Sequence, residues 1–194
     1  SEYTGKMNSL KAEIESLLST VSSNRLAAAS STPNLNDFVN YYQYNYSDPY
    51  YAGTTIAEAG CGPTSMAMVL TYLTGKEVSP VEATNYSLNH GTYVNGQGTA
   101  WSYFEKISSD YGINCEESGV SSQNIVNSLS NGKTVIMSMG PGTFTRSGHF
   151  IVLTGINDDG TVSVADPNSE ERSNTNYDVS TFVNEGKEMW SFDK

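Results

Sequence analysis

The sequence contains few cysteines and histidines, few positive charges and no long hydrophobic run. Only two Cys and two His occur in 194 residues, so neither a Cys-rich zinc site nor a disulfide framework can be built from them. Ten Lys and Arg stand against 21 Asp and Glu, for a formal net charge of -11. The chain therefore lacks the basic surface that nucleic acids require. No apolar run reaches the roughly 18 residues of a membrane span.

The polar residues that are present are mainly neutral. Charged residues make up 16% of the chain, below the average of about 25%, and Ser, Asn, Thr and Tyr supply the remaining polarity. This composition favours a secreted or cell-surface protein, and we expect an export signal to have been removed from its start. The length predicts one domain with a short appendage, large enough for its own hydrophobic core. We expect a monomer.

The first 36 residues form a separate unit in this interpretation. Apolar residues recur at the three- and four-residue spacing of one helix face between Met7 and Val21, which predicts a helix over 7–29. Fewer than three full heptads are present, so we favour a helix docked on the body over a partner-binding coiled coil. The small, polar stretch AAASSTPNLN predicts a linker over 27–36. The functional domain then comprises residues 37–194.

Helices come first in this domain and strands follow. Helices are expected over Pro63–Leu73, from Ser79 onward, along Trp101, Phe104, Ile107 and Tyr111, and around Ile125–Leu129. Strands are expected at Thr134–Met139, His149–Ile156, Thr161–Asp166 and Glu188–Phe192. Because the elements do not alternate as βαβ units, the pattern predicts an α+β fold.

Cys61 lies in the segment Gly60-Cys61-Gly62-Pro63, at the first turn of an apolar helix. Unpaired N–H groups and the helix dipole at this position favour an anion, which lowers the pKa of a thiol. The flanking glycines leave the backbone open to a substrate carbonyl. A buried structural cysteine is the alternative interpretation, and the helix context alone supports both equally.

Cys115 is the poorer nucleophile of the two. It precedes Glu116 and Glu117, and neighbouring carboxylates raise the pKa of a thiol. Packing in the core or in a weak strand is the expected role of this residue. A Cys61–Cys115 disulfide is a third possibility, and it would abolish thiol chemistry.

His149 begins an apolar strand that continues through the turn NDDG into a second strand. Pairing Ile156 with Thr161 puts Asp166 and Asn168 on the same face as His149. Such neighbours lie roughly 5–8 Å apart at Cβ, within reach of a carboxylate–imidazole hydrogen bond. A strand-end histidine and a turn-forming aspartate would explain each residue singly, but the matching face favours a shared function.

A base and an orienting carboxylate on one hairpin, with a thiol on a helix elsewhere, are the groups that a cysteine nucleophile needs. His90 follows a predicted helix in the polar segment Asn89-His90-Gly91, so a solvated or C-capping role is expected for it. We expect the loops over 41–51 and 140–147 to line the cleft. Gly140, Gly142 and Gly148 would admit an extended peptide close to the backbone.

Three segments together resemble the double-glycine (bacteriocin-processing) cysteine peptidase-like family: GCGPTSMAMVLTYLTGK, NGKTVIMSMGPGTFTRSGHFIVLTGI and VADPNS. They are most similar to its stand-alone, secreted bacterial branch within the papain-like superfamily. The resemblance runs from about Tyr41 to the end of the chain. It implies a papain-like cysteine peptidase fold, with N-terminal helices packed on a twisted antiparallel β-sheet.

The resemblance also implies roles for four residues. Cys61 matches the nucleophile, His149 the general base and Asp166 the carboxylate that orients the imidazole. Gln43 matches the glutamine whose amide helps to form the oxyanion hole, at a longer separation from the cysteine than in transporter-linked members. No metal or organic cofactor is implied, since a Cys–His pair performs its own proton transfer.

The expected activity is hydrolysis of peptide bonds through a thioacyl intermediate. Three alternatives remain open. A cell-wall amidase or endopeptidase acting on peptidoglycan peptides would use the same residues. A transferase of the same fold would replace water with an amine. A non-catalytic secreted binding module would keep the scaffold without the reaction. Leader processing within a transporter is less favoured, because no membrane or nucleotide-binding segment is present in the sequence.

Overall fold

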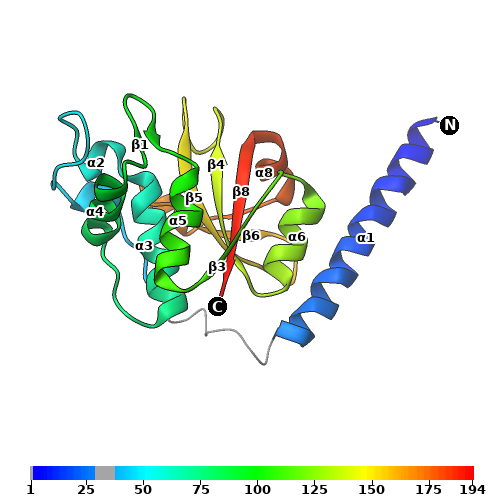
Figure 1. Cartoon of the computed structure of the whole chain (residues 1–194). Coiled ribbons are helices and arrows are strands. Elements are labelled where there is room, and N and C mark those ends of the chain that lie inside the picture. The colour runs from blue at the N-terminus through cyan, green and yellow to red at the C-terminus, as the bar shows by residue number, and fades with distance from the viewer. Residues whose placement is uncertain (1, 29–37) are drawn as a thin grey trace.

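A computed structural model describes residues 2–28 and 38–194 of the chain. A six-stranded sheet forms the centre, α2 to α5 cover one of its faces, and α6 and α8 cover the other (Figure 1). The helices are α1 (Glu2–Ala28), the short 3-10 helix η2 (Gln43–Asn45), α2 (Ile56–Ala59), α3 (Cys61–Thr74), α4 (Pro80–His90), α5 (Ser102–Tyr111), α6 (Ser122–Ser130), α7 (Glu170–Ser173) and α8 (Val179–Glu185). The strands are β1 (Tyr93–Val94), β2 (Gly98–Thr99), β3 (Asn114–Ser118), β4 (Thr134–Met139), β5 (His149–Ile156), β6 (Val162–Ala165), β7 (Asn176–Tyr177) and β8 (Gly186–Asp193).

The large sheet has the strand order β3-β8-β4-β5-β6-β7, and every neighbouring pair is antiparallel. The C-terminal strand β8 therefore lies between β3 and β4 in the middle of the molecule. β1 and β2 form a separate two-stranded hairpin. Helices followed by an antiparallel sheet confirm the predicted α+β class.

Each face of the sheet has its own hydrophobic core, because successive side chains of a strand point to opposite faces. The first core joins α3, α4 and α5 to Ile136, Phe150 and Trp190. The second core joins α6 and α8 to Met137 and Met189 among other side chains of the opposite face. Because both faces of the sheet are buried, the sequences of β4 and of the first half of β5 are almost continuously apolar and do not alternate with polar residues.

The predicted elements that form the two cores are present. β4 and β5 have the predicted bounds, and α3 starts two residues earlier than expected, at Cys61. The weak strand considered for Cys115 is present as β3, but its bounds were not predicted, because its residues NCEES are mostly exposed and an edge strand needs little apolar burial. Trp101 was expected on the buried face of α5. It instead precedes the helix and is 43% exposed.

The N-terminal helix docks through its second half only. Val21 is 3% exposed and packs in the second core, and Asn24 Nδ2 donates a hydrogen bond to Ser130 Oγ of α6 at 2.9 Å. Met7, Leu10 and Ile14 of the predicted apolar face remain exposed. A 27-residue helix is about 40 Å long, whereas the nine-residue α6 spans only about 14 Å. The first half of α1 therefore extends beyond its partner (Figure 1).

Most of the linker predicted over 27–36 lies outside the described residues, so the boundary at residue 37 stays a prediction. Although α1 is long, neither it nor any other helix in the described ranges is apolar enough to cross a membrane.

Candidate active site

Cys61 is the first residue of α3 and follows directly on the short helix α2. α2 begins with a capping box in which the Thr55 N–H donates to the Glu58 carboxylate at 2.8 Å. The glycines on either side of Cys61 permit close packing. A Cβ on Gly60 would lie 2.6 Å from Ile56 side-chain and backbone atoms, and one on Gly62 would lie 2.6 Å from Thr99 Oγ1. The helix start is thereby held against both α2 and the β1–β2 hairpin.

The Cys61 thiol has a lowered pKa. Burial opposes its ionisation, but a hydrogen bond and the positive charge of His149 outweigh that effect. The backbone N–H groups of Phe150 and Gly62 also stabilise the thiolate. Of the three residues that favour the thiolate, His149 and Phe150 belong to the start of β5, and only Gly62 belongs to α3. The thiol is therefore activated mainly by the sheet, with a smaller contribution from its own helix terminus.

The β5–β6 connection differs from the predicted hairpin, although the outcome is the one expected. Ile156 pairs with Val162, so the loop has one residue more than the predicted turn. That shift alone would move Asp166 to the opposite face. A β-bulge at Thr154 compensates for it, because Leu153 pairs with Val164 beyond the bulge. The predicted register is thus restored before the strand reaches His149.

His149 and Asp166 meet at the end of this hairpin. His149 Nε2 lies 2.7 Å from Asp166 Oδ1, and the Asp166 side chain is completely buried. Burial alone would lower the pKa of His149, but its hydrogen bonds with Asp166 and Cys61 raise it to about 9. Because Nε2 faces the carboxylate, Nδ1 is the nitrogen left for the thiol. The imidazolium–thiolate pair is favoured, since the pKa of the thiol is lowered and that of the imidazole is raised.

Asp166 is held by more partners than the sequence indicated. Asn168 N–H donates to Oδ1 at 2.8 Å, and Arg172 Nε donates to Oδ2 at 2.6 Å. Burial opposes the charge of Asp166, but His149, Arg172 and the Asn168 N–H together lower its pKa. Arg172 was missed because it lies on α7, a four-residue helix with no apolar periodicity. A basic residue six positions after an acid is too common in a sequence to single out.

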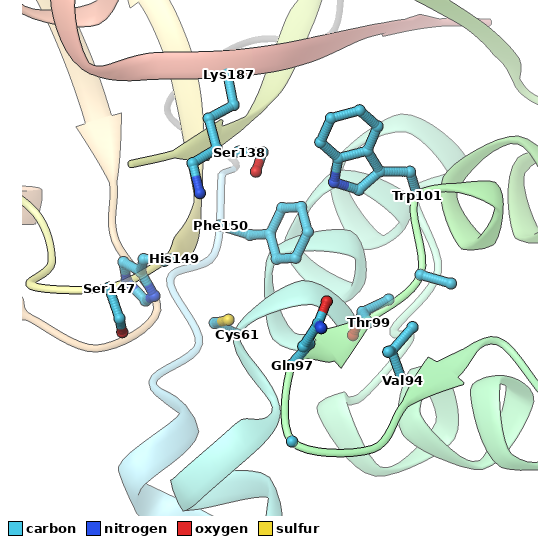
Figure 2. A pocket seen from close by; sticks show the side chains of 13 residues that line it. Cys61, Val94, Gln97, Thr99, Trp101, Ser138, Ser147, His149, Phe150 and Lys187 are labelled. Carbon is cyan, nitrogen blue, oxygen red and sulfur yellow. The ribbon is translucent and has the colours of Figure 1, made fainter. Parts of the chain in front are cut away.

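A pocket of about 590 Å³ opens beside Cys61 and His149 (Figure 2). One wall is the β1–β2 hairpin with Gln97 and Thr99, and Ser147 and Gly148 lie on the His149 side. The sequence reasoning missed the hairpin, and no residue of 41–51 lines this pocket. The remaining lining residues are Val94, Gly96, Ala100, Trp101, Ser138, Phe150 and Lys187.

Only one of the three glycines expected to admit a peptide lines the pocket. A Cβ on Gly140 would lie 3.1 Å from Lys187 Cε, and one on Gly142 would collide with the Glu185 carboxylate. Gly140 and Gly142 therefore make room for side chains of this chain, and Gly148 is the one that faces the pocket.

Gln43 is buried between the two sides of the site. Its backbone N–H donates to Pro167 O at 2.7 Å, next to Asp166, and its Nε2 donates to Ala57 O at 3.0 Å, in the helix before Cys61. Its Oε1 is buried and has no hydrogen-bond partner among the described residues. Gln43 thus joins the β6–α7 loop to α2, which the sequence did not indicate.

The second cysteine and the second histidine lie outside this pocket. Both cysteines are free thiols, so the structure does not contain the Cys61–Cys115 disulfide considered above. His90 is the last residue of α4. Its ring stacks on Tyr86 at 3.9 Å, and its Nδ1 lies 2.8 Å from Tyr86 O. No group of three or more His, Cys, Asp or Glu that could hold a metal ion occurs among the described residues.

A half-buried thiol at a helix start, facing an imidazole on an antiparallel sheet, is the arrangement of the papain-like cysteine peptidases. The chain belongs to the Peptidase_C39-like family, whose model matches residues 35–192. Members of this family are cysteine peptidases, so the protein is assigned to that class of hydrolases. No curated protein matches the chain in sequence.

Two solved structures share the fold. The peptidase domain of Streptococcus ComA, a bifunctional ABC transporter involved in quorum sensing, aligns with a TM-score of 0.56 at 18% identity, over 70% of this chain and 92% of that domain. A double-glycine-motif protease from an AMS/PCAT transporter, solved with a leader peptide, aligns with a TM-score of 0.50 at 20% identity, over 68% of this chain and 82% of that one. At these identities the likeness concerns the fold alone.

Proposed function

We propose that the protein hydrolyses peptide bonds through a catalytic triad of Cys61, His149 and Asp166. The contact that carries this proposal is the 2.7 Å approach of His149 Nε2 to the buried Asp166 carboxylate, which leaves the other ring nitrogen for a thiol of lowered pKa. A satisfied strand-end histidine would need no thiol partner. A binding module would need no activated nucleophile beside a pocket.

The reaction has two halves. The Cys61 thiolate attacks the amide carbonyl and forms a C–S bond, and the His149 imidazolium gives its proton to the leaving amine as the C–N bond breaks. Neutral His149 then takes a proton from water, whose oxygen attacks the thioester; the C–S bond breaks, the carboxylic acid is released, and the Cys61 thiolate and His149 imidazolium are regenerated. Asp166 stabilises the imidazolium and orients the ring throughout.

Gln43 is the proposed second donor to the oxyanion, together with the Cys61 backbone N–H. The amide Nε2 carries two hydrogens, and the bond to Ala57 O uses one of them. The other hydrogen is the one assigned to the oxyanion. The bonds to Pro167 O and Ala57 O hold Gln43 next to the pocket, between the Asp166 loop and the helix before Cys61, without making it part of the pocket lining.

The proposed substrate is a peptide, including the peptide stems of cell walls. The solved relatives give the first class to test, since one is a protease of double-glycine motifs bound to a leader peptide. Location outside the cell, which rests on the composition, and a monomeric state remain proposals.

A hydrolysis assay with three substrate sets tests the proposal. Double-glycine leader peptides, a general peptide library and muropeptides are incubated with the wild-type protein and with the Cys61→Ala and Cys115→Ala variants, and products are identified by mass spectrometry. We expect cleavage of at least one set, retained by Cys115→Ala and reduced by about 10³-fold or more in Cys61→Ala. Undiminished cleavage by purified Cys61→Ala would overturn the triad, and a folded wild-type protein that cleaves nothing would favour the binding module.

A further inference from the structure

Lys187 occupies an irregular position in β8, next to the pocket. Ser138 of β4 pairs with Glu188, whereas Met139 pairs with Gly186, so Lys187 is the extra residue of a β-bulge. A bulge disrupts the ladder locally and changes the direction of a side chain, and such bulges are frequent beside active sites.

The bulge decides which face Lys187 occupies. Met189, two residues further along β8, packs in the second core under α6 and α8. Strict alternation would direct Lys187 to that same face. Instead Lys187 lines the pocket together with Ser138 and Phe150, and its amino group points inward toward the side on which His149 lies (Figure 2).

The aliphatic stem of Lys187 is seated over Gly140. A Cβ on Gly140 would lie 3.1 Å from Lys187 Cε, so a larger residue there would displace the side chain. The carboxylate of the nearby Glu185 accepts a hydrogen bond from Thr143 N–H and forms no ion pair with Lys187. Among the residues that the structure describes, no ion pair involves Lys187.

The pocket is consequently positive in a strongly acidic protein. The chain has a formal net charge of -11, yet the residues that line the pocket include Lys187 and His149 and no Asp or Glu. The groups that lower the pKa of Cys61 are His149 and two backbone N–H groups, and Lys187 is not among them. The charge of Lys187 is therefore not used to activate the thiol.

We infer that Lys187 binds a carboxylate of the substrate close to the scissile bond, which makes it a specificity-determining residue of this site. The inference rests on the proposed peptidase function. The carboxylate can come from an Asp or Glu side chain or from the free C-terminus of a short peptide, and both present the same anion. A charged hydrogen bond of this kind is stronger than a neutral one.

Alkylation of Cys61 tests the charge of the pocket without any requirement for peptidase activity. Iodoacetate and iodoacetamide undergo the same displacement of iodide by the thiolate, but only iodoacetate carries a carboxylate. We expect the ratio of the two Cys61 alkylation rates, iodoacetate over iodoacetamide, to fall by about 10-fold or more in Lys187→Glu and to fall less in Lys187→Met. Lys106→Glu, a matched change on the exposed side of α5, should leave the ratio near that of the wild type. Equal ratios in Lys187→Glu and Lys106→Glu would overturn the inference.

Peptide hydrolysis then identifies the source of the carboxylate. Matched peptides carry Glu or Gln next to the cleaved bond, or a free or amidated C-terminus close to it. We expect one of the two acidic members to be preferred by about 10-fold in kcat/KM, with the preference reduced by salt and lost in Lys187→Glu. Cleavage without any acidic preference would refute the role of Lys187 and leave the peptidase intact. If the alkylation ratio changes as expected but no peptide is cleaved, the proposed peptidase activity is refuted and the anion-binding role of Lys187 is retained.

Discussion

Cys61 and Cys115 lie in two different regions of the molecule, and their surroundings can be compared directly. Both are half-buried free thiols packed against the first core. Cys61 starts α3 and faces His149 and the first N–H groups of β5. Cys115 lies in the edge strand β3, where burial and the charges of Glu105 and Glu117 raise its pKa to about 12. Burial opposes ionisation of both thiols, and it prevails only at Cys115.

The difference shows that the partners of a thiol decide whether the effect of burial on its pKa prevails. Cys61 has a cation and two N–H donors within reach, so its thiolate is solvated by the protein. The charged neighbours of Cys115 are instead the carboxylates of Glu105 and Glu117, which oppose formation of its thiolate.

The first prediction concerns the rates at which the two thiols react with iodoacetamide. At about pH 6, Cys61 should react at least about 10³-fold faster than Cys115 in the native protein, because only the thiolate is nucleophilic. Peptide mapping by mass spectrometry after timed labelling measures both rates in one sample. Equal rates, or selective labelling of Cys115, would contradict the activation of the Cys61 thiol.

The second prediction removes the carboxylate behind His149. Asp166→Asn should lower kcat/KM by about 10²- to 10⁴-fold, since the imidazolium loses its stabilising charge. Asp166 contributes to raising the pKa of His149 to about 9. In the wild type the imidazolium, and with it the activity, is therefore lost as the pH rises through about 9. In the variant this alkaline limb should move to lower pH, which a pH profile of kcat/KM measures.

Cys115 supplies the control for this variant, since its labelling profile should not move. Arg172→Met, which removes a positive charge from the other carboxylate oxygen, should shift the alkaline limb in the opposite direction, to higher pH, by a smaller amount, because an Asp166 carboxylate without Arg172 stabilises the imidazolium more strongly. A profile of Asp166→Asn that coincides with that of the wild type would exclude Asp166 from the triad.

The third prediction separates activation of the thiol from stabilisation of the oxyanion. Gln43→Ala should lower kcat by about 10²- to 10³-fold, while the alkylation rate of Cys61 stays within about twofold, because Gln43 does not contribute to the pKa of the thiol. Gln123→Ala, on the exposed side of α6, is the matched control. Equal losses of turnover and of labelling would show that Gln43 serves the structure of the site rather than the oxyanion.

The sequence predicted the elements that carry Cys61 and His149 better than the details that place these residues. The apolar run of β4 and the His149 strand were bounded correctly, because two-sided burial leaves a continuous hydrophobic pattern. The face shared by His149 and Asp166 was also predicted, but from a turn that is one residue too short. The bulge at Thr154 restored the register, and the local signal that accompanies it, the isolated Gly155 inside the strand, was not used.

Lys187, Arg172 and Gln97 were missed, for a common reason. Each belongs to a bulge, a very short helix or a short hairpin, where hydrophobic periodicity carries no information. Their roles depend on which distant segment lies opposite. In the same way, the exposed first half of α1 was not foreseen, since the periodicity of a helix does not reveal the length of its partner.

Local chemistry in the sequence alone determined three things about this protein: the helix that presents Cys61, the strand that begins with His149, and the α+β order of the elements. Neighbouring residues decide helix starts and strand patterns, so these features can be read from the chain itself. The tertiary structure alone decided that contact with the start of β5 activates Cys61, that Arg172 and Asn168 hold Asp166, and that a bulge directs Lys187 into the pocket. These features depend on charges and N–H groups that only folding brings together, because electrostatic interactions and hydrogen bonds act over distances in space and not along the sequence.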